Sequence, residues 1–323
     1  MRVFKICFFM SVLAFLLQAN ELIYPNSSIG AKNSVISSVV NNNILYLVTD
    51  NGTIEIFDLK NSKNIKTISL EPIEAGFSTI LHAPRVSHID VYNNGEKLLI
   101  VSDDTEAGKA LHIHKNGATE KIFSNKDRLN ISKAYFLDED RVIIGLLGNE
   151  VILYDLKSKK TAYRVQPYWS MLIDFMLNGD KTLSFVAAES GVVYTLNTQD
   201  GVSYKNYDLH TDIILSIDTK KDILITGGAD KKLFVYDLEN DTKYSFATDF
   251  LVYSVGLSPS GKLGAYIANE NNDISIFDTK TKDTIATLKG AEKFVNINKI
   301  IFLNENEVIA SSNNNKILRW KLK

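Results

Sequence analysis

The chain has 323 residues, of which 45% are hydrophobic and 23% charged, and its formal net charge is −2 at pH 7. This length can bury a large core, and the balanced charge without a basic stripe disfavours nucleic acid as a partner. The only cysteine is Cys7, so the chain after residue 19 excludes disulfides, thiolate catalysis, iron–sulfur ligation and covalent c-type haem attachment.

The first predicted element is a secretory signal peptide over residues 1–19. Arg2 and Lys5 precede an apolar run over 6–17, and Ala19 offers a small residue at the cleavage position. The run is shorter than the roughly 20 apolar residues that span a bilayer, and a retained membrane anchor is the alternative. Removal of Arg2 and Lys5 changes the formal net charge from −2 to −4. Abundant Lys, Asn and Ile with little Pro is typical of an AT-rich bacterium. We therefore expect a periplasmic protein with no membrane span after cleavage.

Residues 20–323 are predicted to form one domain of seven repeats. Each repeat contains an alternating apolar and polar phrase, and the phrases occupy residues 50–60, 108–115, 148–157, 190–198, 229–238, 271–279 and 314–322. Equivalent positions in them are Phe57, His114, Tyr154, Leu196, Tyr236, Phe277 and Trp320. The first step is 57 residues, and the later steps are 40, 42, 40, 41 and 43. A period near 40 is typical of a β-propeller blade.

Each repeat has room for four short strands. In the sixth, we expect strands over 251–258, 265–268, 273–278 and 284–288, joined by turns rich in Gly, Asn and Asp. The seventh ends at Lys323 without a fourth strand, and residues 21–29 would supply it. Closure by this segment removes the open sheet edges that favour aggregation. The predicted fold is all-β: a seven-bladed β-propeller closed by an N-terminal strand.

Four repeats end on an aromatic–Asp pair, and the Gly-Gly-Ala-Asp turn at 227–230 precedes one of them. These features resemble degenerate WD40 repeats. The resemblance implies structural roles for the acids of the tight turns and of the aromatic–Asp pairs, namely Asp50, Asp103, Asp230, Asp58, Asp155, Asp237 and Asp278. The sequence departs from the pattern because no repeat has the Gly-His pair, and three repeats replace the paired Asp with Lys115, Asn197 and Lys321.

The signal peptide, the seven repeats and a mature size near 300 residues are together similar to the accessory L proteins of the periplasmic nitrate reductase system of epsilon-proteobacteria. That resemblance implies a non-enzymatic protein without a cofactor, which assists maturation or assembly of a reductase. The partner would be another periplasmic protein, such as a redox enzyme.

The segment 72–85 is an insertion that explains the long first step. In a propeller it would join blade one to blade two at one mouth of the central channel, where the other inter-blade connections also gather. We expect a partner-binding surface there, formed by Phe77, His82, Arg85, Tyr168, Trp169, His210, Phe250 and Phe294. In the alternative, Phe77 and Ile80 fold the insertion down as a plug, and Trp169 and Phe250 belong to the inner packing layer.

No catalytic set is evident in the sequence. His112 and His114 are two apart on a predicted strand, so both rings face one side of the sheet and could bind a metal. Packing of His114 is the favoured interpretation, because other repeats place an aromatic residue there. We therefore expect no metal and no cofactor. The rival hypothesis is a metal-dependent small-ester hydrolase of the lactonase kind, with ligands gathered in the channel mouth from His82, His88, His210 and Asp249.

Overall fold

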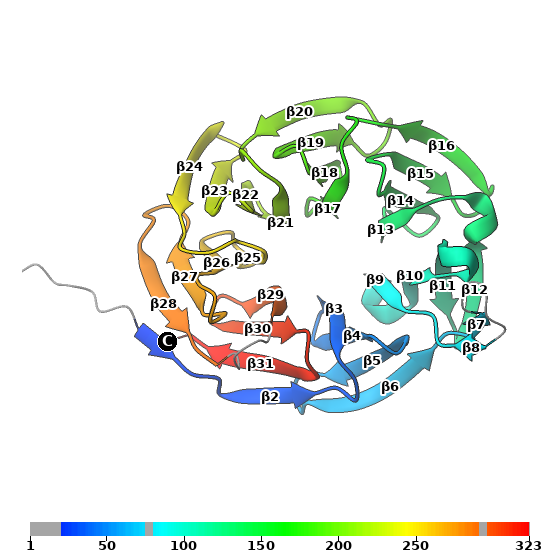
Figure 1. The fold of residues 1–323 in the computed structure, drawn as a ribbon, viewed down its shortest axis with the longest axis horizontal. Coiled ribbons are helices and arrows are strands. Elements are labelled where there is room, and N and C mark those ends of the chain that lie inside the picture. The colour runs from blue at the N-terminus through cyan, green and yellow to red at the C-terminus, as the bar shows by residue number, and fades with distance from the viewer. Residues whose placement is uncertain (1–20, 75–79, 291–295, 323) are drawn as a thin grey trace, which may run out of the picture.

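The computed structural model describes residues 21–74, 80–290 and 296–322. Seven sheets are arranged radially around a central opening, and each runs from that opening to the rim (Figure 1). In blades one to six the four repeat strands are antiparallel and follow chain order, whereas blade seven has three such strands and takes its fourth from the N-terminal segment. The fold is a seven-bladed β-propeller, as the repeat period predicts.

The first four blades contain these strands, given from the axis outward. Blade one has β3 (Val35–Asn41), β4 (Ile44–Thr49), β5 (Thr53–Asp58) and β6 (Lys63–Ser69). Blade two has β9 (Val86–Tyr92), β10 (Lys97–Asp103), β11 (Lys109–Lys115) and β12 (Ala118–Phe123). Blade three has β13 (Ile131–Phe136), β14 (Arg141–Leu146), β15 (Val151–Asp155) and β16 (Lys160–Val165). Blade four has β17 (Leu172–Leu177), β18 (Leu183–Ala188), β19 (Val192–Asn197) and β20 (Ser203–Asp208).

The last three blades complete the circle. Blade five has β21 (Ile214–Lys220), β22 (Ile223–Gly228), β23 (Lys232–Asp237) and β24 (Thr242–Ala247). Blade six has β25 (Val255–Leu257), β26 (Leu263–Ile267), β27 (Ile274–Asp278) and β28 (Thr284–Leu288). Blade seven has β29 (Ile297–Asn304), β30 (Glu307–Ser312) and β31 (Lys316–Lys321). The described helices are the short turns η1 (Asn93–Gly95), η2 (Thr105–Ala107) and η3 (Asn125–Asp127). Within the described residues, no helix is long and apolar enough to cross a membrane.

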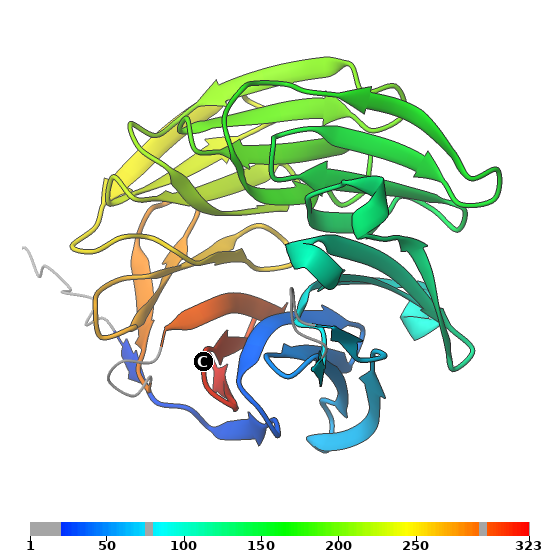
Figure 2. The same ribbon diagram turned by 45° about the vertical axis from the view of Figure 1, so that its right-hand side comes forward.

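The N-terminal segment closes the ring as two strands rather than the single strand predicted over 21–29. β2 (Ser27–Gly30) pairs antiparallel with β31 and is the outer strand of blade seven. β1 (Glu21–Ile23) pairs parallel with β28 and adds a fifth strand to blade six. Pro25 separates them because it lacks an N–H group and constrains the residue before it. Figures 1 and 2 both show the blue N-terminal segment beside the red C-terminal blade.

The hydrophobic core is distributed over the interfaces between neighbouring blades. One cluster joins blades two and three and includes Leu99 and Phe136, and another joins blades seven and one through Ile29, Phe57 and Ile317. Because both faces of each inner sheet are buried, the middle strands are almost continuously apolar.

The aromatic–Asp pairs have the structural role that the WD40 resemblance implies. The aromatic ring is buried between blades, while the carboxylate accepts backbone N–H groups of the following turn. Asp237, for example, accepts hydrogen bonds from the amides of Glu239 and Asn240 at 3.1 and 2.9 Å. The same arrangement is present at Asp58, Asp155 and Asp278.

Candidate functional site

The connections that run from one blade to the next lie on a single face, because each blade has four antiparallel strands. On this face the connection between β16 and β17 carries the most exposed large hydrophobic side chain of the described residues, Trp169, which is 89% exposed. Tyr168 and Met171 are also exposed. The ring of Tyr168 stacks on Tyr194 of blade four, with the centroids 5.4 Å apart, so the blade orients the exposed group. Tyr168 and Trp169 are therefore accessible to a partner.

The described part of the insertion after β6 lies away from the channel mouth, where the insertion was predicted to be. Its strands β7 (Ile73–Glu74) and β8 (Leu81–His82) form a hairpin at the outer rim beside β12 (Figure 1). The hairpin follows β6, the outermost strand of blade one. Ile80 is 72% exposed, which rules out the plug hypothesis for this residue. His82 and Arg85 are exposed.

The other predicted partner-binding residues have different environments. Phe77 and Phe294 lie outside the described residues. Phe250 is partly buried and packs edge-on against Tyr253, with the ring centroids 6.3 Å apart, so it belongs in part to the packing layer.

His210 is buried, so the prediction that it lies on a binding surface is wrong. Its Nδ1 lies 2.8 Å from a carboxylate oxygen of Asp230, and its Nε2 lies 2.7 Å from the hydroxyl of Thr226. Because the carboxylate can only accept, Nδ1–H donates to Asp230 and the Thr226 hydroxyl donates to Nε2. Burial lowers the pKa of His210, although Asp230 opposes this shift. The cluster ties the connection between blades four and five to the turn after β22.

The resemblance implies a structural role for the aspartates of the tight turns. Their side chains have different environments in the structure. Asp230 also accepts the amides of Thr211 and Lys232, which confirms its structural role. Asp103 forms an ion pair with Lys109 across its turn. The Asp50 side chain is exposed and has no hydrogen bond within the described residues, and Asn51 accepts the Thr49 hydroxyl instead.

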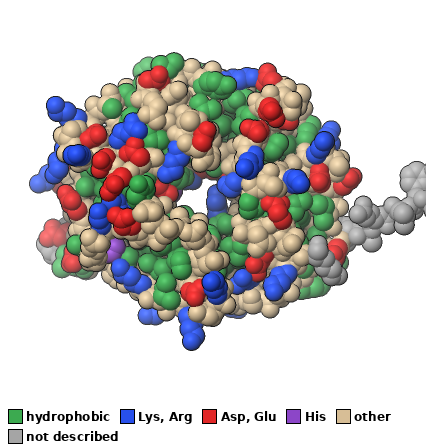
Figure 3. All heavy atoms as spheres, turned by 180° about the vertical axis from the view of Figure 1, so that it is seen from behind, with side chains coloured by type: hydrophobic (Ala, Val, Ile, Leu, Met, Phe, Trp, Pro, Cys, Tyr) green, Lys and Arg blue, Asp and Glu red, His purple; other side chains and the backbone are tan. Residues whose placement is uncertain are grey.

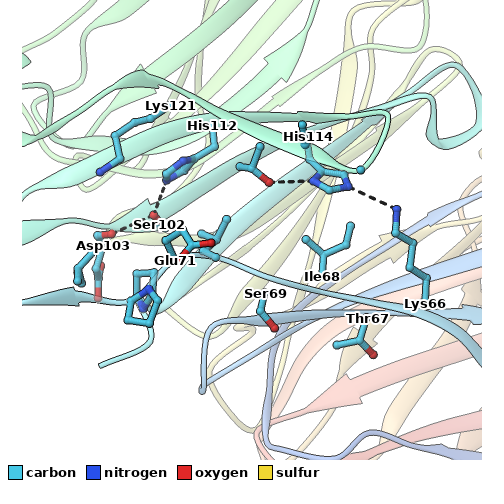
Figure 4. Close-up of a pocket in the computed structure, with 17 residues that line it drawn as sticks. Lys66, Thr67, Ile68, Ser69, Glu71, Ser102, Asp103, His112, His114 and Lys121 are labelled. Carbon is cyan, nitrogen blue, oxygen red and sulfur yellow. Dashed lines mark hydrogen bonds between the residues drawn. The ribbon is translucent and has the colours of Figure 1, made fainter. Parts of the chain in front are cut away.

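A pocket of about 610 Å³ lies at the rim between blades one and two (Figure 4). His112 and His114 of β11 both line it, as expected for residues two apart on a strand. The ammonium Nζ of Lys66 lies 3.4 Å from Nε2 of His114 and can only donate, so Nε2 is the acceptor. The proton of the ring is therefore on Nδ1, which donates to the hydroxyl of Thr119 at 2.8 Å. Ser102 donates to a backbone carbonyl, so it accepts from Nε2–H of His112 at 3.0 Å.

Both rings are uncharged at neutral pH. Burial and the nearby Lys121 lower the pKa of His112 to about 4, and burial and Lys66 lower that of His114. Within the described residues no group of three or more His, Cys, Asp or Glu side chains could hold a metal ion. The pair at His112 and His114 is thus built into the blade by hydrogen bonds, and His114 is buried as predicted.

The ligand gathering required by the ester-hydrolase hypothesis is not seen among the described residues. His82 is on the rim hairpin, and His210 is bound to Asp230 and Thr226. His88 lies on the inner strand of blade two, where it hydrogen-bonds to the carbonyl of Ala134 in blade three at 3.0 Å. Asp249 is exposed on the connection before β25.

Three aspartates on inner strands connect neighbouring blades, and the sequence reasoning missed them. Asp90 accepts the amide of Phe136, Asp174 that of Ile217, and Asp218 that of Leu257, at 2.8, 3.0 and 2.8 Å. In each pair the acceptor and the donor are on adjacent blades. Their only sequence signal is an Asp within an inner strand, and β9 and β21 contain other polar residues as well.

Replacing Asp90 with asparagine is expected to stabilise the protein at neutral pH. Burial raises the pKa of Asp90 to about 6, although the hydrogen bond from Phe136 lowers it. A raised carboxyl pKa means that stability is present at low pH and lost as the pH rises through about 6. The asparagine side chain keeps an acceptor for the Phe136 amide without the charge. We expect a gain of about 2 kcal/mol in the free energy of unfolding at pH 7, disappearing near pH 4.

Urea unfolding of both proteins between pH 4 and pH 8 measures this difference. Asp237→Asn is the matched control, because that carboxylate is solvated and hydrogen bonds lower its pKa. A gain at Asp90→Asn that does not depend on pH contradicts the assignment.

Comparison with known proteins addresses the fold. No protein-family model matches the sequence, and no curated protein matches it. Among solved structures, the chain is similar to the β-propeller domain of Cps50 (Swd1) from Myceliophteria thermophila, with a TM-score of 0.74 and 13% sequence identity. The match covers 93% of this chain and 99% of that domain. The shared property is the propeller fold. At this sequence identity the similarity indicates the fold alone and does not indicate an activity or a partner.

Proposed function

We propose that this protein is a non-enzymatic interaction platform that acts in the periplasm after removal of residues 1–19. The observation that carries the proposal is the exposed aromatic pair on the β16–β17 connection. Trp169 is 89% exposed, and Tyr168 stacks on Tyr194, so the pair combines solvent exposure with a defined orientation. Exposed Trp and Tyr side chains held by a rigid scaffold are the groups that dominate binding energy in protein interfaces.

The Trp169 surface is defined as Tyr168, Trp169 and Met171. All three side chains are exposed and lie within one connection on the face of the inter-blade connections. Isolated apolar side chains are common on protein surfaces, whereas a cluster favours a binding site. The partner we propose is a periplasmic redox enzyme that the platform helps to mature or assemble. The resemblance to the nitrate reductase accessory proteins supports a nitrate reductase as that enzyme.

A photo-reactive amino acid at position 169 tests the platform and its partner together. Expressed in the native periplasm, it is expected to cross-link one protein, and the partner proposal predicts a nitrate reductase subunit. The same amino acid at position 204 is the control, because Tyr204 is also exposed but is the second residue of β20, near the opposite face. Another partner at 169 alone rejects the nitrate reductase assignment and keeps the platform. Absence of a specific product at 169 rejects the surface.

Trp169→Ala is expected to weaken capture of the cross-linked partner by at least tenfold, since a central Trp contributes about 2 kcal/mol or more to binding. Because the side chain is exposed, the free energy of unfolding should change by no more than about 0.5 kcal/mol. Tyr204→Ala provides the matched control and should leave capture unchanged. Equal affinities for the Trp169→Ala protein and the wild type would contradict a role for this side chain.

A further inference from the structure

The pocket at the rim between blades one and two, called the rim pocket below, has a continuous stretch of chain along one wall. Residues 66–73 all line it, from the second half of β6 to the start of the insertion. Neighbouring side chains of a strand point to opposite faces of the sheet, so a pocket on one face alone would be lined by alternate residues. Because Lys66, Thr67, Ile68 and Ser69 all line the rim pocket, it borders the edge of β6 and its backbone groups.

The edge of β6 that borders the rim pocket has no neighbouring strand. β6 is the last strand of its sheet, and within the described residues it pairs only with β5, which occupies the other edge. An edge strand presents unpaired N–H and C=O groups that can pair with another extended chain. The protein itself uses this property in blade six, where β1 pairs with the outer strand β28 and adds a fifth strand. The edge of β6 is open to the same type of pairing.

The rim pocket also has one uncompensated charge of each sign. Two of its charged side chains, Lys121 and Asp103, form ion pairs with neighbouring residues. The exposed side chains of Lys66 and Glu71 form no ion pair within the described residues. The Nζ of Lys66 lies 3.4 Å from Nε2 of His114, which is an uncharged ring. Figure 4 shows Lys66 beside His114 and Glu71 nearer to Asp103, so the two free charges stand apart in the pocket.

The spacing of these two charges fits an extended peptide. Lys66 and Glu71 are five residue steps apart, about 16 Å in an extended chain, which about six residues of a second strand span. A small zwitterion such as an amino acid is much shorter. Pro72 has no N–H group, so pairing along this edge ends at Glu71. Ile68 and Leu70 add apolar lining for peptide side chains. Acidic and basic side chains are interspersed in the rear view (Figure 3), so no broad patch of one sign favours a polyanion there.

We propose that the rim pocket binds an extended peptide segment of a partner protein, which pairs antiparallel with the free edge of β6. Main-chain hydrogen bonds supply the affinity in this mode of recognition, and side chains supply the specificity. In the antiparallel direction a basic residue at the start of the segment meets Glu71, and an acidic residue at its end meets Lys66. The site is on blades one and two, whereas the Trp169 surface joins blades three and four, so either proposal can fail without the other.

Two hexapeptides with blocked ends test the proposal by NMR titration of the ¹⁵N-labelled protein. The probe is Arg-Val-Thr-Val-Thr-Glu, and the control Glu-Val-Thr-Val-Thr-Arg has the same composition with its charges exchanged. We expect the probe to shift the amide resonances of β6 saturably and to bind about tenfold more tightly than the control. In the complex, every second amide from Lys66 to Leu70 should gain protection from hydrogen exchange, because alternate N–H groups of an edge strand face the added strand.

A charge exchange separates recognition by the rim pocket from general stickiness of a strand edge. Lys66→Glu should weaken binding of the probe about tenfold, and the peptide Arg-Val-Thr-Val-Thr-Lys should recover the lost affinity. Lys63→Glu is the matched control, because Lys63 is an exposed lysine of the same strand outside the lining of the pocket, and it should change the affinity by less than twofold. Shifts that do not saturate, equal affinities for the probe and the control peptide, or binding without protection of β6 amides overturns the proposal.

Discussion

Replacing Ile29 with aspartate is expected to lower the free energy of unfolding by at least about 4 kcal/mol. Ile29 is buried at the centre of β2, opposite the buried Ile317 of β31. It packs in the cluster that joins blades seven and one, together with Phe57. A carboxylate there has no partner and detaches the outer strand of blade seven. The edge of β31 would then be open to pairing with another chain.

Urea unfolding followed by tryptophan fluorescence measures this loss directly. Trp320 is buried in blade seven and donates a hydrogen bond to the carbonyl of Lys289, so it reports on the closing blade. Leu22→Asp is the matched control: it introduces the same acid in β1, where the side chain is 56% exposed. We expect a change below about 0.5 kcal/mol for the control. Equal losses in the two proteins would show that β2 has no special role in closure.

The propeller could be predicted from the sequence because its signal is periodic. Equivalent residues such as Tyr154, Tyr236 and Phe277 recur at nearly constant spacing, and each must fill the same space between two blades. The role of the paired acids follows from local geometry, since Asp237 bonds to residues only two and three positions ahead. Features that depend on contacts within one repeat can therefore be predicted from a single sequence.

Features that depend on contacts between blades were harder to predict. The sequence of 21–29 predicts one strand. In the structure, Pro25 divides this segment between blades six and seven, which lie at the other end of the sequence. His210 reads as a loop residue, but Asp230, twenty positions later, and Thr226 bury it. The bonds of Asp90, Asp174 and Asp218 to the next blade were not recognised, because their partners are 39 to 46 residues away in the sequence. Side-chain partners across blades leave no local pattern.

The binding surface shows the same difference between features local to one segment and features that depend on several segments. The predicted binding surface combined residues that share one connection with residues from separate connections. Tyr168 and Trp169 share a connection, and both are exposed. The rim hairpin carries His82 to the outer edge near β12, away from the central opening (Figure 1). The platform proposal consequently depends on the β16–β17 connection, and the insertion is better regarded as one wall of the rim pocket.

Replacing His210 with alanine is expected to lower the free energy of unfolding by about 3 kcal/mol. The substitution removes a buried ring that packs edge-on against Phe234, with the centroids 4.8 Å apart. It also leaves the Thr226 hydroxyl without its acceptor and takes one donor from Asp230. The closest contacts of the ring belong to blade five, so the loss should loosen the connection from blade four and increase hydrogen exchange of its backbone amides.

His82→Ala is the matched control, because His82 is an exposed histidine of the same chain and should cost no more than about 0.5 kcal/mol. His210→Asn separates the lost hydrogen bonds from the lost volume, since a shorter amide can still donate towards Asp230. We expect it to recover part of the stability lost in His210→Ala. If His210→Ala and His82→Ala unfold at the same urea concentration, the cluster of His210, Asp230 and Thr226 does not brace the propeller, and His210 could again be considered for a binding role.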